Sequence, residues 1–245
     1  MPSWSVHLAL AKKANEKLNL NKELFYYGCL IPDASKNTPI KREDLHYYDF
    51  NNGFKTVPKE TPIDPDRFVK DNIKDISNPL ILGYLAHLLA DNFYNEFIYT
   101  NFWVQDNDHN IIGVKLNTGK VIPVKPGVLR KYKHYDLELY GKYLYNEGKV
   151  EVPKDIDIVV DNIGYLKPQF LNRELVCDRI DYLNLDFKEF NKLTFMQKIF
   201  KHKYKLSNKK QLDEQFDLCC DYIVNYINDV LEKYSDQLLN DYTIK

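Results

Sequence analysis

The stretch from Asn78 to Phe97 constrains the fold more than any other part of the 245-residue chain. Its opening Asn-Pro pair is typical of a helix start, because proline is favoured in the first turn. His87 and Asp91 are four residues apart on this expected helix and therefore share one face with apolar neighbours. Polar side chains that face a core need partners. The pair therefore predicts either a structural His–Asp interaction or part of a metal site.

Helical patterns also dominate the rest of the chain. Asn21 is a candidate N-cap for the second helix. Residues 102–125 differ, because short β-prone runs separated by turn residues predict a small β-ribbon. The proline-rich segment 33–66 is expected to be irregular. We therefore predict an all-α single domain over residues 1–245, with the ribbon as an insertion. The other expected helices cover residues 7–20, 22–27, 66–75, 129–146 and 210–239.

Composition argues against several classes of protein. The chain is 44% hydrophobic and 28% charged, which is typical of a globular protein. Its 34 basic and 35 acidic residues give a net charge of −1, which disfavours tight binding to long nucleic acid. We expect no transmembrane helix and no secretory signal. The four cysteines lack paired spacing and are expected to be reduced thiols, so we expect a cytoplasmic protein.

Other histidines and carboxylates also suggest chemistry. His134 and Glu138 repeat the four-residue spacing on another expected helix, where the alternative is an exposed ion pair worth ~0.3–0.5 kcal/mol. His7 begins the apolar face of the first helix, and Asp33 ends an apolar run at a turn. His46 lies in an aromatic part of the long irregular segment. Each of these three residues alone has an ordinary structural explanation.

Taken in order, these residues resemble the pattern of the zinc-dependent phospholipase C family. That family is all-helical and shares its architecture with zinc-dependent single-strand nucleases. The resemblance is strongest over residues 1–140. It rests on His7, the segment 28–33, Leu45-His46-Tyr47, the H-x-x-x-D motif of His87 and Asp91, and the H-x-x-x-E motif of His134 and Glu138.

The resemblance implies a centre of two or three zinc ions, and other divalent transition metals also suit such nitrogen and oxygen ligands. Asp91 would bridge two of the ions, the second of which also binds His7. His134 and Glu138 would hold a third ion. The implied ligands are His7, Asp33, His46, His87, Asp91, His134 and Glu138.

Two of the departures from the family pattern concern the metal ligands. The family has a further histidine soon after its H-x-x-x-D motif, but none lies between His87 and His109 here. Glu96, Asn95 or His109 are the candidates to replace it. The family's secreted members bind zinc through the amine and carbonyl of an N-terminal tryptophan, whereas Trp4 is internal and is expected to pack in the core.

The activity implied by the resemblance is phospholipase C-like hydrolysis of a phosphate ester by zinc-activated water. Asp33 would act as both ligand and general base. The partner would be a small phosphate ester or a phospholipid head group. Two alternatives remain: a nuclease or nucleotidase of the same architecture, and a catalytically silent helical domain that binds zinc or a partner protein. His202, between two lysines, is expected to be solvated.

Overall fold

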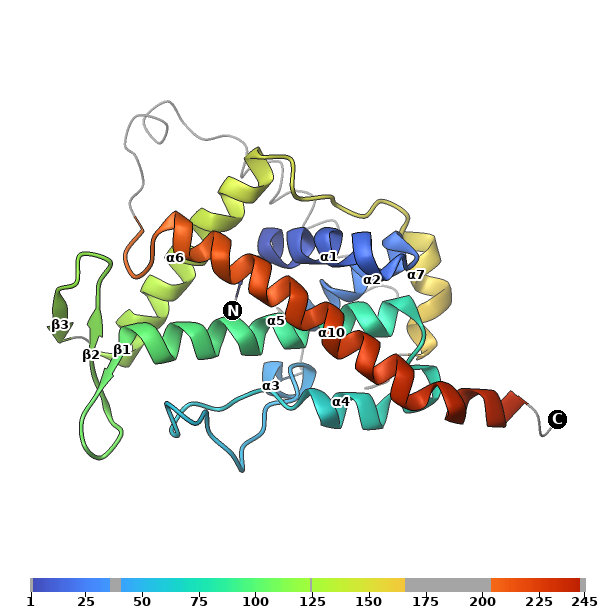
Figure 1. Ribbon diagram of the computed structural model, residues 1–245, viewed down its shortest axis with the longest axis horizontal. Helices are drawn as coiled ribbons and strands as arrows, with labels where there is room; N and C mark the ends of the chain where they lie inside the picture. The colour runs from blue at the N-terminus through green and yellow to red at the C-terminus, as the bar shows by residue number, and fades with distance from the viewer. Residues whose placement is uncertain (1, 36–40, 124, 166–203, 243–245) are drawn as a thin grey trace.

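The computed structural model describes residues 2–35, 41–123, 125–165 and 204–242. These residues form a mostly helical structure with one small antiparallel sheet, as predicted (Figure 1). His202 lies outside the described residues. Among those described, no helix combines the length and apolar character needed to cross a membrane.

Helix α5 (Pro79–Phe102) runs through the middle of the molecule (Figure 1). The side chain of Asn78 accepts a hydrogen bond from the Leu80 amide, which caps the helix at its predicted start. The helix continues past its predicted end at Phe97, because Ile98 and the residues after it pack into an apolar cluster with the sheet. Buried side chains occur on all its sides, which is typical of a central helix.

Several helices pack directly against α5. The Asn21 side chain accepts a hydrogen bond from the Leu24 amide, so the predicted N-cap is confirmed. Helix α6 (Pro126–Asn146) starts three residues before the predicted 129 and contacts α1. The helices against α5 are α1 (Trp4–Leu18), α2 (Lys22–Gly28), α4 (Pro65–Asp71) and α10 (Lys209–Tyr242).

Helices α2 and α5 approach so closely that only glycine fits at their crossing. A Cβ on Gly83 would lie 2.1 Å from the Phe25 carbonyl oxygen, and one on Gly28 would lie 2.2 Å from the Leu80 oxygen. Both distances are far below any allowed contact between nonbonded atoms. The crossing therefore fixes the position of His87, which follows one turn after Gly83 on α5.

The segment predicted to be irregular contains two short helical elements. The first is the 3-10 helix η1 (Ile31–Ser35), and the second is α3 (Arg42–Leu45). A further 3-10 turn, η2 (Ile73–Asp75), follows α4, so the single helix expected over 66–75 is divided in two. Helix α7 (Ile156–Asn162) leads into η3 (Ile163–Tyr165).

The predicted β-ribbon is a three-stranded antiparallel sheet at one end of the molecule (Figure 1). Strands β1 (Trp103–Gln105), β2 (Ile111–Lys115) and β3 (Val121–Pro123) follow each other in space as in sequence. All three lie within the predicted 102–125. The apolar residues of the sheet pack on the C-terminal half of α5 and on the start of α6.

Asp136 on α6 fixes the backbone that leads into α10. Its buried carboxylate accepts hydrogen bonds from the amides of Lys205 and Leu206, both at 2.7 Å, and of Ser207 at 3.1 Å. Charge-assisted bonds of this kind are about twice as strong as neutral ones. They attach α10 to the rest of the helices and thereby help to cover α5.

Candidate metal centre

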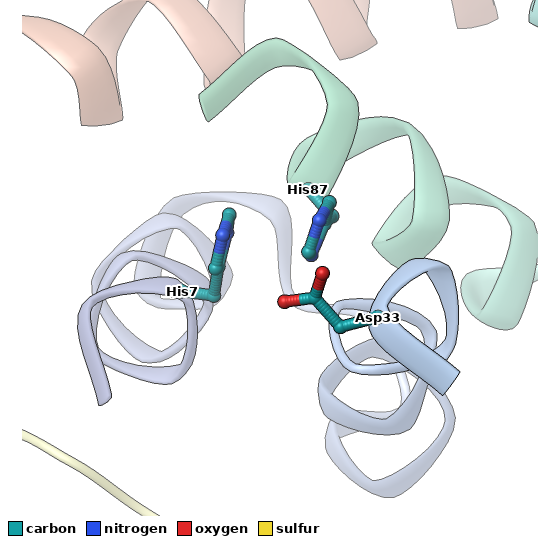
Figure 2. A group of neighbouring side chains, drawn as sticks. All are labelled: His7, Asp33 and His87. Carbon is teal, nitrogen blue, oxygen red and sulfur yellow. The ribbon is translucent and has the colours of Figure 1, made fainter. Parts of the chain in front are cut away.

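Five of the predicted ligands meet between α1, the η1–α3 segment and α5. Figure 2 shows His7 from α1, Asp33 from η1 and His87 from α5. His46 follows α3, and Asp91 lies one turn after His87. All five are buried, and Asp33, at 8% exposure, is the most accessible. Polar groups buried at this density require partners, because their desolvation is costly.

The ring of His87 is oriented by the backbone of the α2 C-terminus. Its Nδ1 lies 2.7 Å from the Cys29 carbonyl oxygen. A carbonyl can only accept, so Nδ1 carries the proton and the lone pair of Nε2 faces the cluster. The Nε2 atom is 3.8 Å from the nearer Asp91 oxygen, which is too long for a hydrogen bond. A simple His–Asp hydrogen bond, one of the two readings of the spacing, is therefore wrong.

His46 is held in the same way. Its Nδ1 lies 3.0 Å from the Arg42 carbonyl oxygen, so its Nε2 lone pair also points inward. The two Nε2 atoms of His46 and His87 are 3.4 Å apart, and the ring centroids are 5.3 Å apart. The two nitrogens are close enough to be ligands of one ion. A cation bound between them would lie within reach of both nitrogens. Histidine ligands of metals usually show this donation from the other ring nitrogen.

His7 and Asp91 supply the unsatisfied atoms of the cluster. The His7 ring stacks on His87 at a centroid distance of 3.8 Å, and its Nε2 is 3.3 Å from Asp91 Oδ1. Among the described residues, both nitrogens of His7 and both oxygens of Asp91 lack a hydrogen-bond partner. Each such buried atom costs about 1–3 kcal/mol. A bound cation would satisfy the carboxylate and a ring nitrogen together.

Asp33 is anchored at both oxygens. The Trp4 indole Nε1 donates to Oδ2 at 2.8 Å, and Arg42 Nη1 donates to Oδ1 at 2.9 Å. Burial acts to raise the pKa of Asp33, but the surrounding donors and positive charge, Arg42 among them, hold it well below its usual range. Trp4 packs against the core as expected, yet its contact with Asp33 is a second role that the sequence did not indicate.

Replacing Trp4 with phenylalanine is expected to weaken zinc binding about 10- to 100-fold, because Asp33 loses the donor that orients it. Competition with a chelating dye measures the affinity. Trp103→Phe is the matched control, since the Trp103 indole nitrogen is buried without a hydrogen-bond partner among the described residues. Equal affinities for the two variants would show that the indole does not position Asp33.

The ligand atoms fall into two groups whose members all lie within 4.8 Å of one another. One group is His7, Asp33 and His87, and the other is His46, His87 and Asp91. Imidazole nitrogen with carboxylate oxygen is a donor set that zinc prefers and that iron, manganese and nickel also accept. These buried groups can hold a metal ion, which agrees with the predicted cofactor class.

The two predicted ligands of a third ion are on helix α6. His134 and Glu138 are exposed on α6, and neither belongs to the two ligand groups. Their metal-binding role therefore stays a prediction.

The structure also gives the positions of the three residues considered as replacements for the missing family histidine. Asn95 is buried on α5 and accepts a hydrogen bond from Lys133 Nζ at 2.8 Å. Glu96 is exposed, and so is His109 in the turn between β1 and β2. Asn95 therefore lies in the interior with its oxygen already bound to an ammonium group, and the other two face solvent.

Arg42 and Lys133 are the two residues of this region that the sequence did not single out. Arg42 Nη2 is 2.6 Å from His46 Nε2 and 3.8 Å from Asp91 Oδ2. Arg42 is four residues before His46, and α3 brings the two together, but no helix was predicted there. Lys133 gave no signal, since a helical lysine is normally solvent-exposed; here its ammonium is buried against Asn95.

Burial lowers the pKa of His87 to about 3. The unfolded chain binds a proton at His87 near pH 6.5, and the folded chain does not, so acidification favours unfolding. We expect the free energy of unfolding to fall by about 2 kcal/mol between about pH 6.5 and pH 5 in the presence of a chelator. Urea unfolding at both pH values measures it. His87→Gln should flatten this dependence and His109→Gln should keep it; the reverse result would contradict the assignment.

Comparison of the chain with protein-family models, curated proteins and solved structures found no match.

Proposed function

We propose that this chain is a metal-dependent hydrolase of phosphate esters, similar to the zinc-dependent phospholipases C, with zinc as its metal. The observation that carries the proposal is the convergence of two Nε2 atoms, from His46 and His87, beside the buried carboxylate of Asp91, with both rings oriented by backbone carbonyls. The unpaired atoms of His7 and Asp91 support it.

Asp91 is suited to hold two ions together. Its Oδ1 faces His7 Nε2 at 3.3 Å, while its Oδ2 faces His46 Nε2 at 3.6 Å and His87 Nε2 at 3.8 Å. The two carboxylate oxygens thus point toward different ring nitrogens, as a bridging ligand requires. Zinc ions bound there would lower the pKa of a water towards ~7 and neutralise charge on a phosphoryl group.

Asp33 remains the proposed proton acceptor. It is the most exposed of the five buried residues, so a proton taken up at its carboxylate can pass to solvent. Its low pKa keeps it ionised at neutral pH, which suits a ligand, but also makes it a weak base. The proposal therefore requires that Asp33 hands the proton on rather than retaining it. The hydrogen bonds from Trp4 and Arg42 keep its carboxylate in one orientation.

The test is metal content combined with hydrolysis by the full chain. Zinc per chain is counted by elemental analysis, and activity is followed on p-nitrophenyl phosphorylcholine and bis(p-nitrophenyl) phosphate. We expect at least one zinc per chain and hydrolysis that a chelator abolishes and added zinc restores. Full zinc loading without hydrolysis of either ester would favour the silent metal-binding domain.

A nucleotidase is the second candidate, because aromatic rings lie beside the cluster. Tyr48 packs edge-on against His46 at a centroid distance of 6.2 Å and against Phe50 at 6.3 Å. Phe50 is 71% exposed, so its ring is free to stack on a base. Tyr47 and Phe54, from the same segment, are buried in the core. A nucleoside monophosphate hydrolysed faster than the phosphocholine ester would favour this candidate.

A further inference from the structure

Arg42 brings a positive charge directly onto the candidate ligand atoms. Its Nη1 lies 2.9 Å from Asp33 Oδ1, and its Nη2 lies 2.6 Å from His46 Nε2 and 3.8 Å from Asp91 Oδ2. The side chain is 34% exposed, whereas His46 and Asp91 are completely buried. The guanidinium therefore reaches from the surface into the cluster.

The contact with His46 uses the atom that a metal would need. His46 Nδ1 donates to the Arg42 carbonyl oxygen, so Nε2 is the acceptor for Arg42 Nη2. An imidazole nitrogen has one lone pair in the ring plane. That lone pair can bind either the guanidinium or a metal ion, but not both. The Asp33 oxygen is different, because a carboxylate oxygen has lone pairs for two partners.

We infer that Arg42 is a built-in competitor of the metal: its guanidinium holds His46 Nε2 and must leave that nitrogen when a metal ion binds there. The inference rests on the proposed metal centre and concerns how tightly that centre binds. Arg42 keeps Asp33 as a partner after it leaves His46, so the movement is a local change of the side chain. Its partial exposure gives the guanidinium room to move toward solvent.

Competition has a consequence that differs between the metal-depleted and metal-loaded protein. Without metal, Arg42 is the countercharge of two buried carboxylates, Asp33 and Asp91, and its loss leaves them uncompensated. With metal, the ion supplies that countercharge. Removing Arg42 should therefore destabilise the depleted protein and strengthen metal binding. Removing a residue that only supports the fold would also destabilise the depleted protein, but it would weaken metal binding.

The experiment measures zinc affinity of the full chain by competition with a chelating dye. Arg42→Ala and Arg42→Gln should bind zinc about tenfold or more tightly than the unchanged chain, because the competing state is removed. Arg67→Ala is the control: it removes the same charge from an exposed site on α4, and its zinc affinity should stay within about threefold. The glutamine variant keeps a long polar side chain in case alanine prevents folding.

Thermal unfolding supplies the second readout. With a chelator present, Arg42→Ala should melt at a lower temperature than the unchanged chain, and saturating zinc should remove that difference. Unchanged or weaker zinc affinity in both Arg42 variants would overturn the inference while the unchanged chain still binds zinc, leaving the proposed function in place. If neither the unchanged chain nor any variant binds zinc, the proposed function and the inference fail together.

Discussion

Replacing Asp91 with asparagine is expected to weaken zinc binding by more than about a hundredfold and to remove hydrolysis with it. The carboxylate faces His7 through one oxygen and His46 and His87 through the other. An amide keeps the shape of the side chain but loses the charge and one acceptor oxygen. Asp91 belongs to one ligand group and also faces His7 of the other, so both positions should be weakened at once. Elemental analysis measures zinc content, dye competition measures zinc affinity, and ester hydrolysis measures activity.

His134→Ala is the comparison for this result. His134 is exposed on α6 and belongs to neither ligand group, so we expect a much smaller effect on zinc content. If Asp91→Asn folded normally and kept full zinc occupancy and turnover, Asp91 would not be a bridging ligand. If His134→Ala instead lost zinc as severely, the third ligand set implied by the resemblance would gain support.

The long helices with a periodic apolar pattern could be predicted from the sequence, but the residues at which they end could not. Helix α5 was expected to finish near Phe97, yet it continues because Ile98 contributes to a second apolar cluster with the sheet. That cluster also contains Phe54 and Leu206, which are distant in the chain and leave no local signal. Helix α3 escaped prediction because it comprises four residues, and so short a helix is stabilised by tertiary contacts rather than by propensity.

The candidate metal centre was likewise predictable in part. The residue types and their order brought five ligand candidates together, since two of them share a helix face at a spacing of four. The groups that orient them were not predictable. The Cys29 carbonyl aligns His87, and the Arg42 carbonyl aligns His46. Every residue has a carbonyl, so only the fold reveals which one a ring nitrogen meets.

The position of the proton on the His87 ring distinguishes a candidate metal site from an ordinary polar cluster. The spacing of His87 and Asp91 alone fits a direct hydrogen bond equally well. Because His87 Nδ1–H donates to the Cys29 carbonyl oxygen, Nε2 of the neutral ring carries no proton to donate to Asp91, and their 3.8 Å separation agrees. The inference from sequence to site therefore depends on the crossing of α2 and α5, which places Cys29 against His87.

That crossing is the target of the last prediction. Gly83→Ala is expected to lower the free energy of unfolding by about 3 kcal/mol or more, at the upper end for an overpacked core. The added Cβ would lie 2.1 Å from the Phe25 carbonyl oxygen and 3.0 Å from Gly28 Cα. Both are backbone atoms of α2, so no side chain can turn aside, and the two helices must separate.

Gly127→Ala is the matched control, because it also places alanine in a helix but its Cβ has no neighbour within 4 Å. It should be neutral or stabilising by up to about 1 kcal/mol. Urea unfolding of the two variants measures the difference. Separation of α2 from α5 should also lengthen the bond from His87 to Cys29, so Gly83→Ala should bind zinc more weakly than Gly127→Ala. Equal stability of the two variants would show that the close approach of the helices is not required. Unchanged zinc affinity in a destabilised Gly83→Ala would show that zinc binding does not depend on the helix crossing.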